Sequence, residues 1–220
     1  MKASDYIAAA ISGVGVNHIF GYTGGMVAHL IDSIDKNPSL EMINMITEQG
    51  AGFAAEGYAK NSNKLGVAIA TSGPGAINLL TPMAGCYFDS VPVLFITGQV
   101  NSNEYRKFKK IRQNGFQEAN IIDMANPITK YANFIDSPLK LAEELHKAMH
   151  IAKTGRKGPV LLDIPMDIQR AEINDFSIPS FEEKNYADGK NDSIVELIRL
   201  SKRPVLLVGG GVRLSGAAEE

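Results

Sequence analysis

The sequence predicts an α/β fold: a doubly wound, mostly parallel sheet with helices on both of its faces. One observation behind this prediction is that short apolar runs of strand length recur along the chain. Another is that a segment with helical periodicity separates each run from the next. Strands that are apolar on both sides belong to a sheet whose two faces are covered, which is the usual arrangement of parallel strands joined by helices.

The expected elements alternate between residues 4 and 164. The expected strands are the apolar runs at residues 18–21, 42–46, 66–70, 92–97 and 159–164. The expected helices lie at residues 4–12, 26–35, 76–87 and 139–152, and one more starts after Glu48. Two glycine-rich loops, Gly21–Gly25 and Thr71–Gly75, mark junctions at which a strand leads into a helix.

The junction at Thr47 and Glu48 places a charge in an unusual position. The apolar run before it is interpreted as a buried strand, and the helix after it consists largely of Gly and Ala, which favours close packing. Removing a carboxylate from water is costly. Glu48 is therefore either a helix-start carboxylate that interacts with the helix dipole or a functional group. Glu56, in contrast, is expected on the surface in an ion pair with Lys60.

The two glycine-rich loops are candidate ligand-binding elements. Open α/β sheets bind their ligands at the carboxyl ends of the strands, where both loops are expected. Glycine lets a ligand approach the backbone, whose N–H groups can face an anion at a helix start. A plain tight turn is the favoured interpretation of either loop taken alone. Neither loop ends in the Gly-Lys-Ser/Thr of a P-loop, and a non-catalytic module that binds nucleotide phosphates is kept as an alternative.

Three segments are expected along the 220 residues. Residues 1–168 form the α/β domain. Residues 169–192 are rich in acidic side chains and poor in large apolar ones, so they are predicted to be an interdomain linker. Residues 193–220 hold a helical pattern and the apolar run Val205–Val208, which predicts the start of a second α/β domain. The chain is expected to be a fragment of a longer protein.

The composition is that of an ordinary globular protein. Hydrophobic residues make up 45% of the chain and charged residues 21%, with a net charge of -2. This balance indicates neither a nucleic acid nor a membrane as a partner. The single cysteine, Cys86, excludes an intrachain disulfide and suits a reducing cytoplasm. Its apolar surroundings predict a buried core residue rather than a nucleophile.

Two further patterns have competing interpretations. Residues 106–112 contain five basic side chains; a solvated face is the favoured interpretation, and a loop that attracts an anionic substrate to the active-site entrance is the other. His146 and His150 are four residues apart on a predicted helix, a spacing compatible with a metal site. No glutamate adjoins His146 and no third ligand is nearby, so a plain helical face is favoured and no metal ligand is expected.

Several sequence blocks together resemble a known family. These blocks are IFGYTGG, TEQGAGFAAEGYAK, ATSGPGAINLLTPMAGCYFDSVPVLFITGQV, GFQEANIID and TGRKGPVLLDIP. Over residues 1–168 the chain resembles the amino-terminal, pyrimidine-binding domain of thiamine-diphosphate-dependent enzymes of the acetolactate synthase group. RPVLLVGGGVRLSGAAEE is similar to the start of that family's middle domain. The resemblance implies the thiamine-diphosphate-binding fold and a decarboxylating carboligase that converts two pyruvates to 2-acetolactate and carbon dioxide.

The resemblance also implies roles for individual residues. Glu48 matches the glutamate that hydrogen-bonds a ring nitrogen of the aminopyrimidine, so that the cofactor can deprotonate its own thiazolium carbon. Gly25 matches a glycine whose N–H group steadies a developing oxyanion, and Gln117 matches a glutamine that reaches the cofactor and the substrate. The residues matched to the aminopyrimidine site are Tyr22, Gly24, Thr71, Pro74 and Asn78.

The cofactors follow from the same resemblance. Thiamine diphosphate is expected, with Mg²⁺ held by a domain that this chain lacks, so that the fragment is expected to be inactive alone. Arg156 matches an arginine that contacts FAD in relatives that keep this flavin. Met166 stands where the family typically has lysine, which weakens both the FAD and the acetolactate assignments. Thr23 and Thr47 also depart from the family's usual proline and histidine.

The expected partners are a 2-oxo acid substrate and further copies of the same chain. The family forms homodimers or homotetramers in which two subunits share each active site, and the small side chains of the helix after Glu48 (Ala51, Ala54, Ala55 and Ala59) suit such an interface. A cytoplasmic role in branched-chain amino acid biosynthesis is implied. Two alternatives within the family are a decarboxylase or carboligase with another acceptor, and a non-catalytic subunit.

Overall fold

The computed structural model describes residues 1–105, 111–174, 181 and 191–217. The chain divides into two compact units, Met1–Phe181 and Glu182–Glu220, and each is described by itself. The basic side chains Arg106, Lys107, Lys109 and Lys110 lie outside the described residues.

The first unit is built on one six-stranded sheet in which every neighbouring pair of strands is parallel. The strand order is β2-β1-β3-β4-β6-β5. The strands are β1 (His18–Gly21), β2 (Glu41–Asn44), β3 (Gly66–Ala70), β4 (Val93–Gln99), β5 (Tyr131–Phe134) and β6 (Val160–Pro165). The predicted α/β fold with a doubly wound parallel sheet is confirmed.

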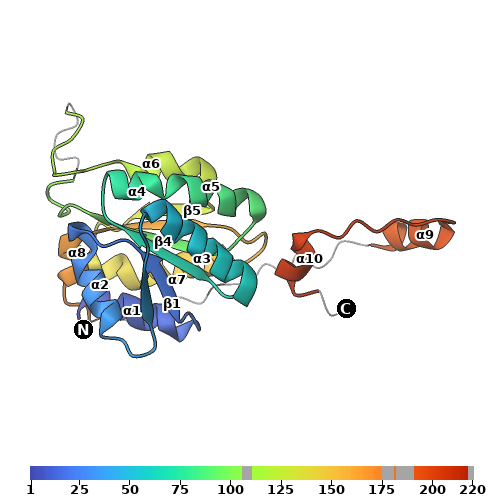
Figure 1. Cartoon of the computed structure of the whole chain (residues 1–220), viewed down its shortest axis with the longest axis horizontal. Helices are drawn as coiled ribbons and strands as arrows, with labels where there is room; N and C mark the ends of the chain where they lie inside the picture. The colour runs from blue at the N-terminus through green and yellow to red at the C-terminus, as the bar shows by residue number, and fades with distance from the viewer. Residues whose placement is uncertain (106–110, 175–180, 182–190, 218–220) are drawn as a thin grey trace. The chain divides into compact units, whose positions relative to one another are not determined.

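Helices cover both faces of this sheet (Figure 1). One face carries α1 (Ala3–Gly13), α2 (Ala28–Asp35), α7 (Leu141–Lys153) and α8 (Met166–Arg170). The other carries α3 (Glu48–Ser62), α4 (Pro74–Asn78), α5 (Leu80–Asp89) and α6 (Ile121–Ala125). Short 3₁₀ turns are η1 (Gly25–Val27), η2 (Asn126–Ile128) and η3 (Pro138–Lys140). Each face has its own apolar core, and β3, β4 and β6 contribute side chains alternately to both.

The strand that precedes Glu48 differs from its prediction. β2 ends at Asn44, and its four residues are only half-buried or exposed because it lies at the edge of the sheet. Ile46, which was expected inside a buried strand, is 92% exposed. An apolar run shows that a segment can be buried, but the position of the strand in the sheet decides how much of it is buried. The interpretation of residues 42–46 as a buried strand is therefore wrong.

Two other differences have local causes. The helix expected at residues 76–87 is divided into α4 and α5 at Leu79. Pro82 has no N–H group to donate to the carbonyl of Asn78, so the α-helical hydrogen bonding is interrupted there. The sequence pattern also did not predict β5, an edge strand with polar residues whose four side chains are all half-buried.

Glu56 is not the solvated surface charge that was predicted. Its residue is only 8% exposed, although the predicted pair with Lys60 is present at 2.6 Å. Lys60 also contacts Asp89 at 2.7 Å, so one ammonium group joins α3 to the end of α5. Cys86 is fully buried on α5, as predicted, and burial raises the pKa of its thiol.

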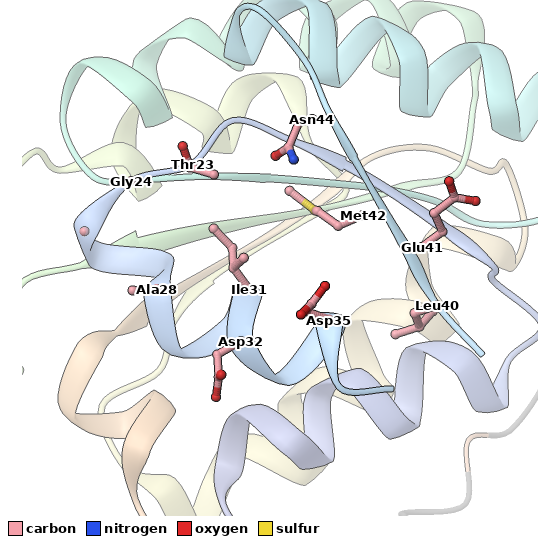
Figure 2. A pocket seen from close by; sticks show the side chains of 11 residues that line it. Thr23, Gly24, Ala28, Ile31, Asp32, Asp35, Leu40, Glu41, Met42 and Asn44 are labelled. Carbon is pink, nitrogen blue, oxygen red and sulfur yellow. The ribbon is translucent and has the colours of Figure 1, made fainter. Parts of the chain in front are cut away.

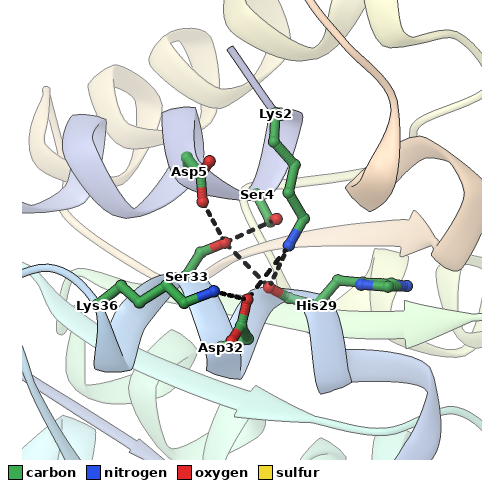
Figure 3. A network of polar contacts seen from close by, with 7 residues as sticks. All are labelled: Lys2, Ser4, Asp5, His29, Asp32, Ser33 and Lys36. Carbon is green, nitrogen blue, oxygen red and sulfur yellow. Dashed lines mark hydrogen bonds and ion pairs between the residues drawn. The ribbon is translucent and has the colours of Figure 1, made fainter.

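A polar network joins α1 to α2 (Figure 3). The Ser33 hydroxyl lies 2.6 Å from a carboxylate oxygen of Asp5 and 2.8 Å from the hydroxyl of Ser4. Lys2 reaches over to Asp32 at 3.5 Å. Because Ser4 and Ser33 are buried, these hydrogen bonds satisfy polar groups that would otherwise be costly to enclose. The network fixes α2, and with it the glycine loop that leads into α2.

A carboxyl group is fully buried inside the sheet at Asp163 of β6. The hydroxyl of Thr97 donates to Oδ1 at 2.7 Å, and Nε2 of Gln99 donates to Oδ2 at 3.0 Å. Burial raises the pKa of Asp163 to about 7, while these two hydrogen bonds act in the opposite direction. Among the described residues, no charged side chain contributes to this shift.

The described part of the second unit contains two helices, α9 (Asp192–Leu200) and α10 (Gly210–Ser215). The strand predicted at Val205–Val208 is absent from the described residues, and these four side chains are exposed. A strand needs a hydrogen-bonded neighbour, and the described part of this unit offers none. Two residues of the predicted linker, Gln169 and Ile173, are buried in the first unit. Within the described residues, no helix is long and apolar enough to cross a membrane.

The buried carboxyl group predicts how stability changes with pH. The pKa of Asp163 is raised from 3.8 to about 7 in the folded state, so the folded chain binds more protons than the unfolded chain between these values. The free energy of unfolding should therefore fall as the pH rises from about 4 to about 7. Asp163→Asn keeps the shape and removes the titrating group, so it should remove this decrease. Urea unfolding across this pH range checks it. Asp136→Asn, which removes an exposed carboxylate, is the control and should keep the decrease; an unchanged slope in Asp163→Asn would contradict the prediction.

Candidate active site

The parallel sheet brings the candidate residues to one edge. The loop after β1 contains Gly24 and Gly25, the loop after β3 contains Thr71 and Gly73, and α3 begins shortly after β2 ends. Since β2, β1 and β3 are adjacent and parallel, all three segments lie at the carboxyl edge of the sheet. This is where open α/β sheets bind their ligands.

Glu48 is the first residue of α3, and its neighbours fix its position. Thr47 caps the helix, because its hydroxyl oxygen accepts a hydrogen bond from the N–H group of Gly50 at 3.1 Å. Nδ2 of Asn78 donates to Oε2 of Glu48 at 3.0 Å. The other oxygen, Oε1, faces Gly75, where a Cβ atom would lie only 3.1 Å away. Glu48 is half-exposed in this chain, so one carboxylate oxygen is held and the other remains accessible.

Thr71 connects the two glycine-rich loops. Its side chain lies against the backbone of Gly24, where any Cβ atom would collide with it. Its hydroxyl oxygen also accepts a hydrogen bond from the N–H group of Met26 at 3.3 Å. The loop after β1 and the loop after β3 are therefore held together by one side chain.

Gln117 reaches the same edge from a different part of the chain. It lies in the loop between β4 and α6 and has a left-handed backbone, with φ 55°. A Cβ atom at Gly73 would lie 2.5 Å from the carbonyl oxygen of Gln117, so the two backbones are in contact. Gln99 ties this loop to the sheet, because its Nε2 donates to the carbonyl oxygen of Ala119 at 3.0 Å as well as to Asp163.

The remaining predicted residues differ in their places. Tyr22, Gly25 and Pro74 are exposed at the same carboxyl edge. Arg156 lies before β6, at the opposite edge, where its Nε donates to the hydroxyl of Ser90 at 2.8 Å. It is therefore separate from the cluster around Glu48.

A pocket of about 650 Å³ lies next to the loop after β1. Figure 2 shows that side chains of α2 and β2 line it, with Gly24 at one end. Ile31, Leu40 and Met42 supply apolar surface, while Asp32, Asp35 and Glu41 supply carboxylates. Its lining contains neither Glu48 nor Asn78. The pocket thus lies on the α2 side of the glycine loop, apart from the Glu48 cluster, and no motif in the sequence predicts it.

Ser72 is a residue of this edge that was not among those predicted from the sequence. It lies between Thr71 and Gly73 and is 1% exposed, and its hydroxyl has no hydrogen-bond partner among the described residues.

His146 lies away from this edge. Its Nε2 is 2.9 Å from the hydroxyl of Tyr6 on the α1 side of the sheet, and burial lowers the pKa of His146. No group of three potential metal ligands occurs within the described part of the chain.

This arrangement can exchange a proton with a bound heterocycle. Asn78 holds Oε2 of Glu48, so Oε1 can accept a hydrogen bond from a ring N–H group or share its proton. The glycine at position 75 leaves space directly beside that oxygen. The backbone N–H group of Gly25 and the side chain of Gln117 belong to exposed residues of the neighbouring loops. The cluster suits a planar, nitrogen-containing ligand better than a metal ion.

Comparison with known proteins agrees with this geometry. Residues 1–124 match the family described as thiamine pyrophosphate enzyme, N-terminal TPP binding domain. The chain is 37% identical over 224 residues to the acetolactate synthase large subunit of Lactococcus lactis, covering 99% of this chain and 38% of that protein. It is 38% identical to the acetolactate synthase large subunit of Corynebacterium glutamicum, covering 100% of this chain and 35% of that protein.

A plant protein gives the same result. The chain is 37% identical over 222 residues to the chloroplastic acetolactate synthase of Arabidopsis thaliana, covering 96% of this chain and 32% of that protein. The chain therefore spans between 32% and 38% of the length of these three relatives.

The contact between Gly73 and Gln117 predicts a position that does not tolerate a side chain. Gly73 has φ +62° and no room for a Cβ atom, so Gly73→Ala should lower the free energy of unfolding by about 1–3 kcal/mol. Gly57→Ala is the matched control, because Gly57 is exposed on α3 with nothing near its Cβ position. It should raise stability by about 0.5–1 kcal/mol. Urea unfolding of the 220-residue chain measures both; a Gly73→Ala variant as stable as the parent would show that this contact is not present.

Proposed function

The chain belongs to the thiamine pyrophosphate enzyme family, and from this premise we propose that it is the amino-terminal cofactor-binding part of a thiamine-diphosphate-dependent carboligase. The proposed reaction is that of an acetolactate synthase: two pyruvates give 2-acetolactate and carbon dioxide. The names of the relatives support this reaction. The observation that carries the proposal is the carboxylate of Glu48, which Asn78 holds at the carboxyl edge between two glycine-rich loops.

The residues at this edge fit the aminopyrimidine of thiamine diphosphate. Gly75 leaves room beside Oε1 of Glu48, and Ser72 has a buried hydroxyl without a partner in the described residues. When bound, the cofactor supplies a thiazolium carbon that can become a nucleophile toward a 2-oxo acid. Glu48 would hold or accept a proton at Oε1, opposite a ring nitrogen, while Asn78 keeps the carboxylate in place.

The other residues would orient the cofactor and the substrate. Tyr22, Thr71 and Pro74 would border the ring, with Gly24 packed behind it against Thr71. The N–H group of Gly25 would donate to an oxygen on which negative charge develops. Because the backbone already holds this donor in place, little reorganisation energy is needed during the reaction. Gln117 would contact the substrate from the third loop. Mg²⁺ would be held with the diphosphate by a part of the protein beyond these 220 residues.

The proposed active site needs a second subunit to exclude water. Glu48 is half-exposed, and large apolar side chains on α3, on α5 and beside them are exposed as well: Ile46, Phe53, Ile77, Tyr87 and Phe88. Such apolar surface is typical of an interface. We therefore propose a homodimer or homotetramer. Ala51, Ala55 and Ala59 are fully buried within this chain, so the exposed apolar side chains, and not these alanines, would form the contact.

Two departures from the family pattern have different consequences. Thr47, in place of the usual histidine, has a structural role because it caps α3. Met166 replaces the usual lysine at the start of α8, which favours a related carboligase with another acceptor as the second candidate. FAD stays a proposal that depends on Arg156. The proposed setting is the cytoplasm and branched-chain amino acid biosynthesis.

Replacement of the carboxylate tests the proposed role of Glu48. In the full-length protein, Glu48→Gln should lower kcat by two or more orders of magnitude, since an amide cannot exchange a proton with the ring, while the fold is kept because Gln still accepts from Asn78. Glu143→Gln, on an exposed position of α7 on the other face of the sheet, is the control and should leave turnover unchanged. Turnover equal to the parent in Glu48→Gln would refute the role.

A substrate screen tests the reaction itself. Full-length protein with thiamine diphosphate and Mg²⁺ should consume pyruvate and form 2-acetolactate, while the 220-residue chain should not. A panel of 2-oxo acids as donors and acceptors separates the two candidates: faster carboligation onto an acceptor other than pyruvate would favour the second. No turnover of any 2-oxo acid, with cofactor present, would refute both.

A further inference from the structure

Gln169 is a buried amide in a segment where the sequence predicted a linker. Its residue is fully buried on α8. Nε2 donates to the carbonyl oxygen of Met26 at 2.7 Å and to that of Ile164 at 2.9 Å. Oε1 has no hydrogen-bond partner among the described residues. Leaving the buried Oε1 acceptor without a hydrogen bond costs free energy of folding. A buried amide that carries this cost calls for a role beyond stability.

The carbonyl group of Met26 is held from a second side. Gly98 of β4 lies directly against it, at a distance that any Cβ atom would block. A side chain at position 98 would therefore push the Met26 carbonyl away from Gln169. The absence of a side chain lets the turn at Gly25–Val27 approach the end of β4, and Gln169 satisfies the carbonyl that is enclosed there.

The N–H group of the same residue is also bonded. Met26 donates to the hydroxyl oxygen of Thr71 at 3.3 Å. Its backbone N–H is therefore fixed by the loop after β3, and its carbonyl by α8. Gly25, directly before it, is exposed, with nothing near its Cβ position. The turn is therefore bonded to the protein through Met26 and accessible to a ligand at Gly25.

The helix that carries Gln169 is itself anchored. The carboxylate of Asp167 accepts hydrogen bonds from the N–H group and the hydroxyl of Ser102, at 2.9 Å and 2.6 Å. The N–H group of Ala3 donates to the carbonyl of Ala171 at 2.8 Å. With an anchor on each side, α8 offers a fixed point from which the amide can act on the turn.

We propose that Gln169 is a positioning residue: it clamps the carbonyl of Met26 and thereby fixes the direction of the Gly25 N–H group. This inference rests on the proposed function, from which the role of Gly25 comes. A hydrogen-bond donor stabilises developing charge only when it points at the correct position before the reaction begins. Gln169 touches neither cofactor nor substrate, and it acts through two residues of backbone.

Two variants of the full-length enzyme separate positioning from stability. Gln169→Met has a similar length and no N–H donor, so it should lower kcat by about tenfold to a hundredfold while the KM for pyruvate changes little. Gln169→Glu has one O–H donor when protonated and none when ionised. Burial raises the pKa of such a carboxyl group, so its kcat relative to the parent should rise by about threefold or more as the pH falls from 8 to 6. The same ratio for Gln169→Met should not change with pH.

Lys130→Met is the matched control for lost hydrogen bonds. Nζ of Lys130 also donates to two backbone carbonyls, those of Ile151 and Thr154. These carbonyls lie at the carboxyl end of α7, near the amino edge of the sheet. This variant should lose stability while kcat stays that of the parent. A loss of kcat in Lys130→Met equal to that in Gln169→Met would show that the effect is one of stability and would overturn the proposal.

Amide hydrogen exchange of the 220-residue chain gives a reading without cofactor. In Gln169→Met, exchange of residues 22–28 should become faster, and in Lys130→Met it should not. Unchanged exchange in Gln169→Met overturns the clamp, as does an unchanged kcat in an active full-length enzyme. If full-length parent protein turns over no 2-oxo acid although exchange responds as expected, the proposed function fails and the clamp on Met26 stands.

Discussion

The parallel pairing of β2, β1, β3, β4 and β6 is the constraint on which the rest of the structure depends. Parallel strands end on the same side, so each chain segment that leaves a strand begins at the same edge. Glu48, Thr71 and Gln117 are far apart in the sequence, and this pairing brings them to one edge of the sheet. There Gly75 lies against the side chains of Glu48 and Thr71, and Gly73 lies against the backbone of Gln117. An antiparallel partner in any of these places would send one of the loops to the opposite edge, where Arg156 lies.

The carboxyl edge is held from within by buried polar side chains, and no ion pair takes part among those described. Asp163 and Gln99 tie down the loop of Gln117, and Gln169 ties down the turn after Gly25. Each of these groups loses hydration, and hydrogen bonds with good geometry offset that loss. Hydrogen bonds are directional, whereas apolar packing is not, so this is a suitable way to set the orientation of a loop. The apolar cores on the two faces stabilise the sheet, and the polar groups orient what leaves it.

Sequence patterns predicted the elements that depend on local physics. The bounds of β1 and β3 were predicted to the residue, because each is an apolar run between clear turn signals. The edge position of β2, the half-buried strand β5 and the buried Glu56 depend on neighbours in space, which a pattern in one segment does not contain. The positions of Glu48 and Asn78 side by side follow from topology, while the roles assigned to them came from resemblance. Gln169 was missed because a lone polar residue before an acidic segment looks like the start of a linker.

Cys86 has a practical consequence that follows from its isolation. It is the only cysteine of the chain, and it is fully buried in the core beneath α5, with a thiol whose pKa is raised. The thiolate is the nucleophile that reacts with thiol reagents, so a buried thiol with a raised pKa should resist alkylation and oxidation in the native protein. Labelling therefore requires that α5 separate from the sheet. The chain carries a native reporter of opening on the face of the sheet that α3 and α5 cover, and the rate at which a thiol reagent modifies it measures how often that face of the protein comes apart.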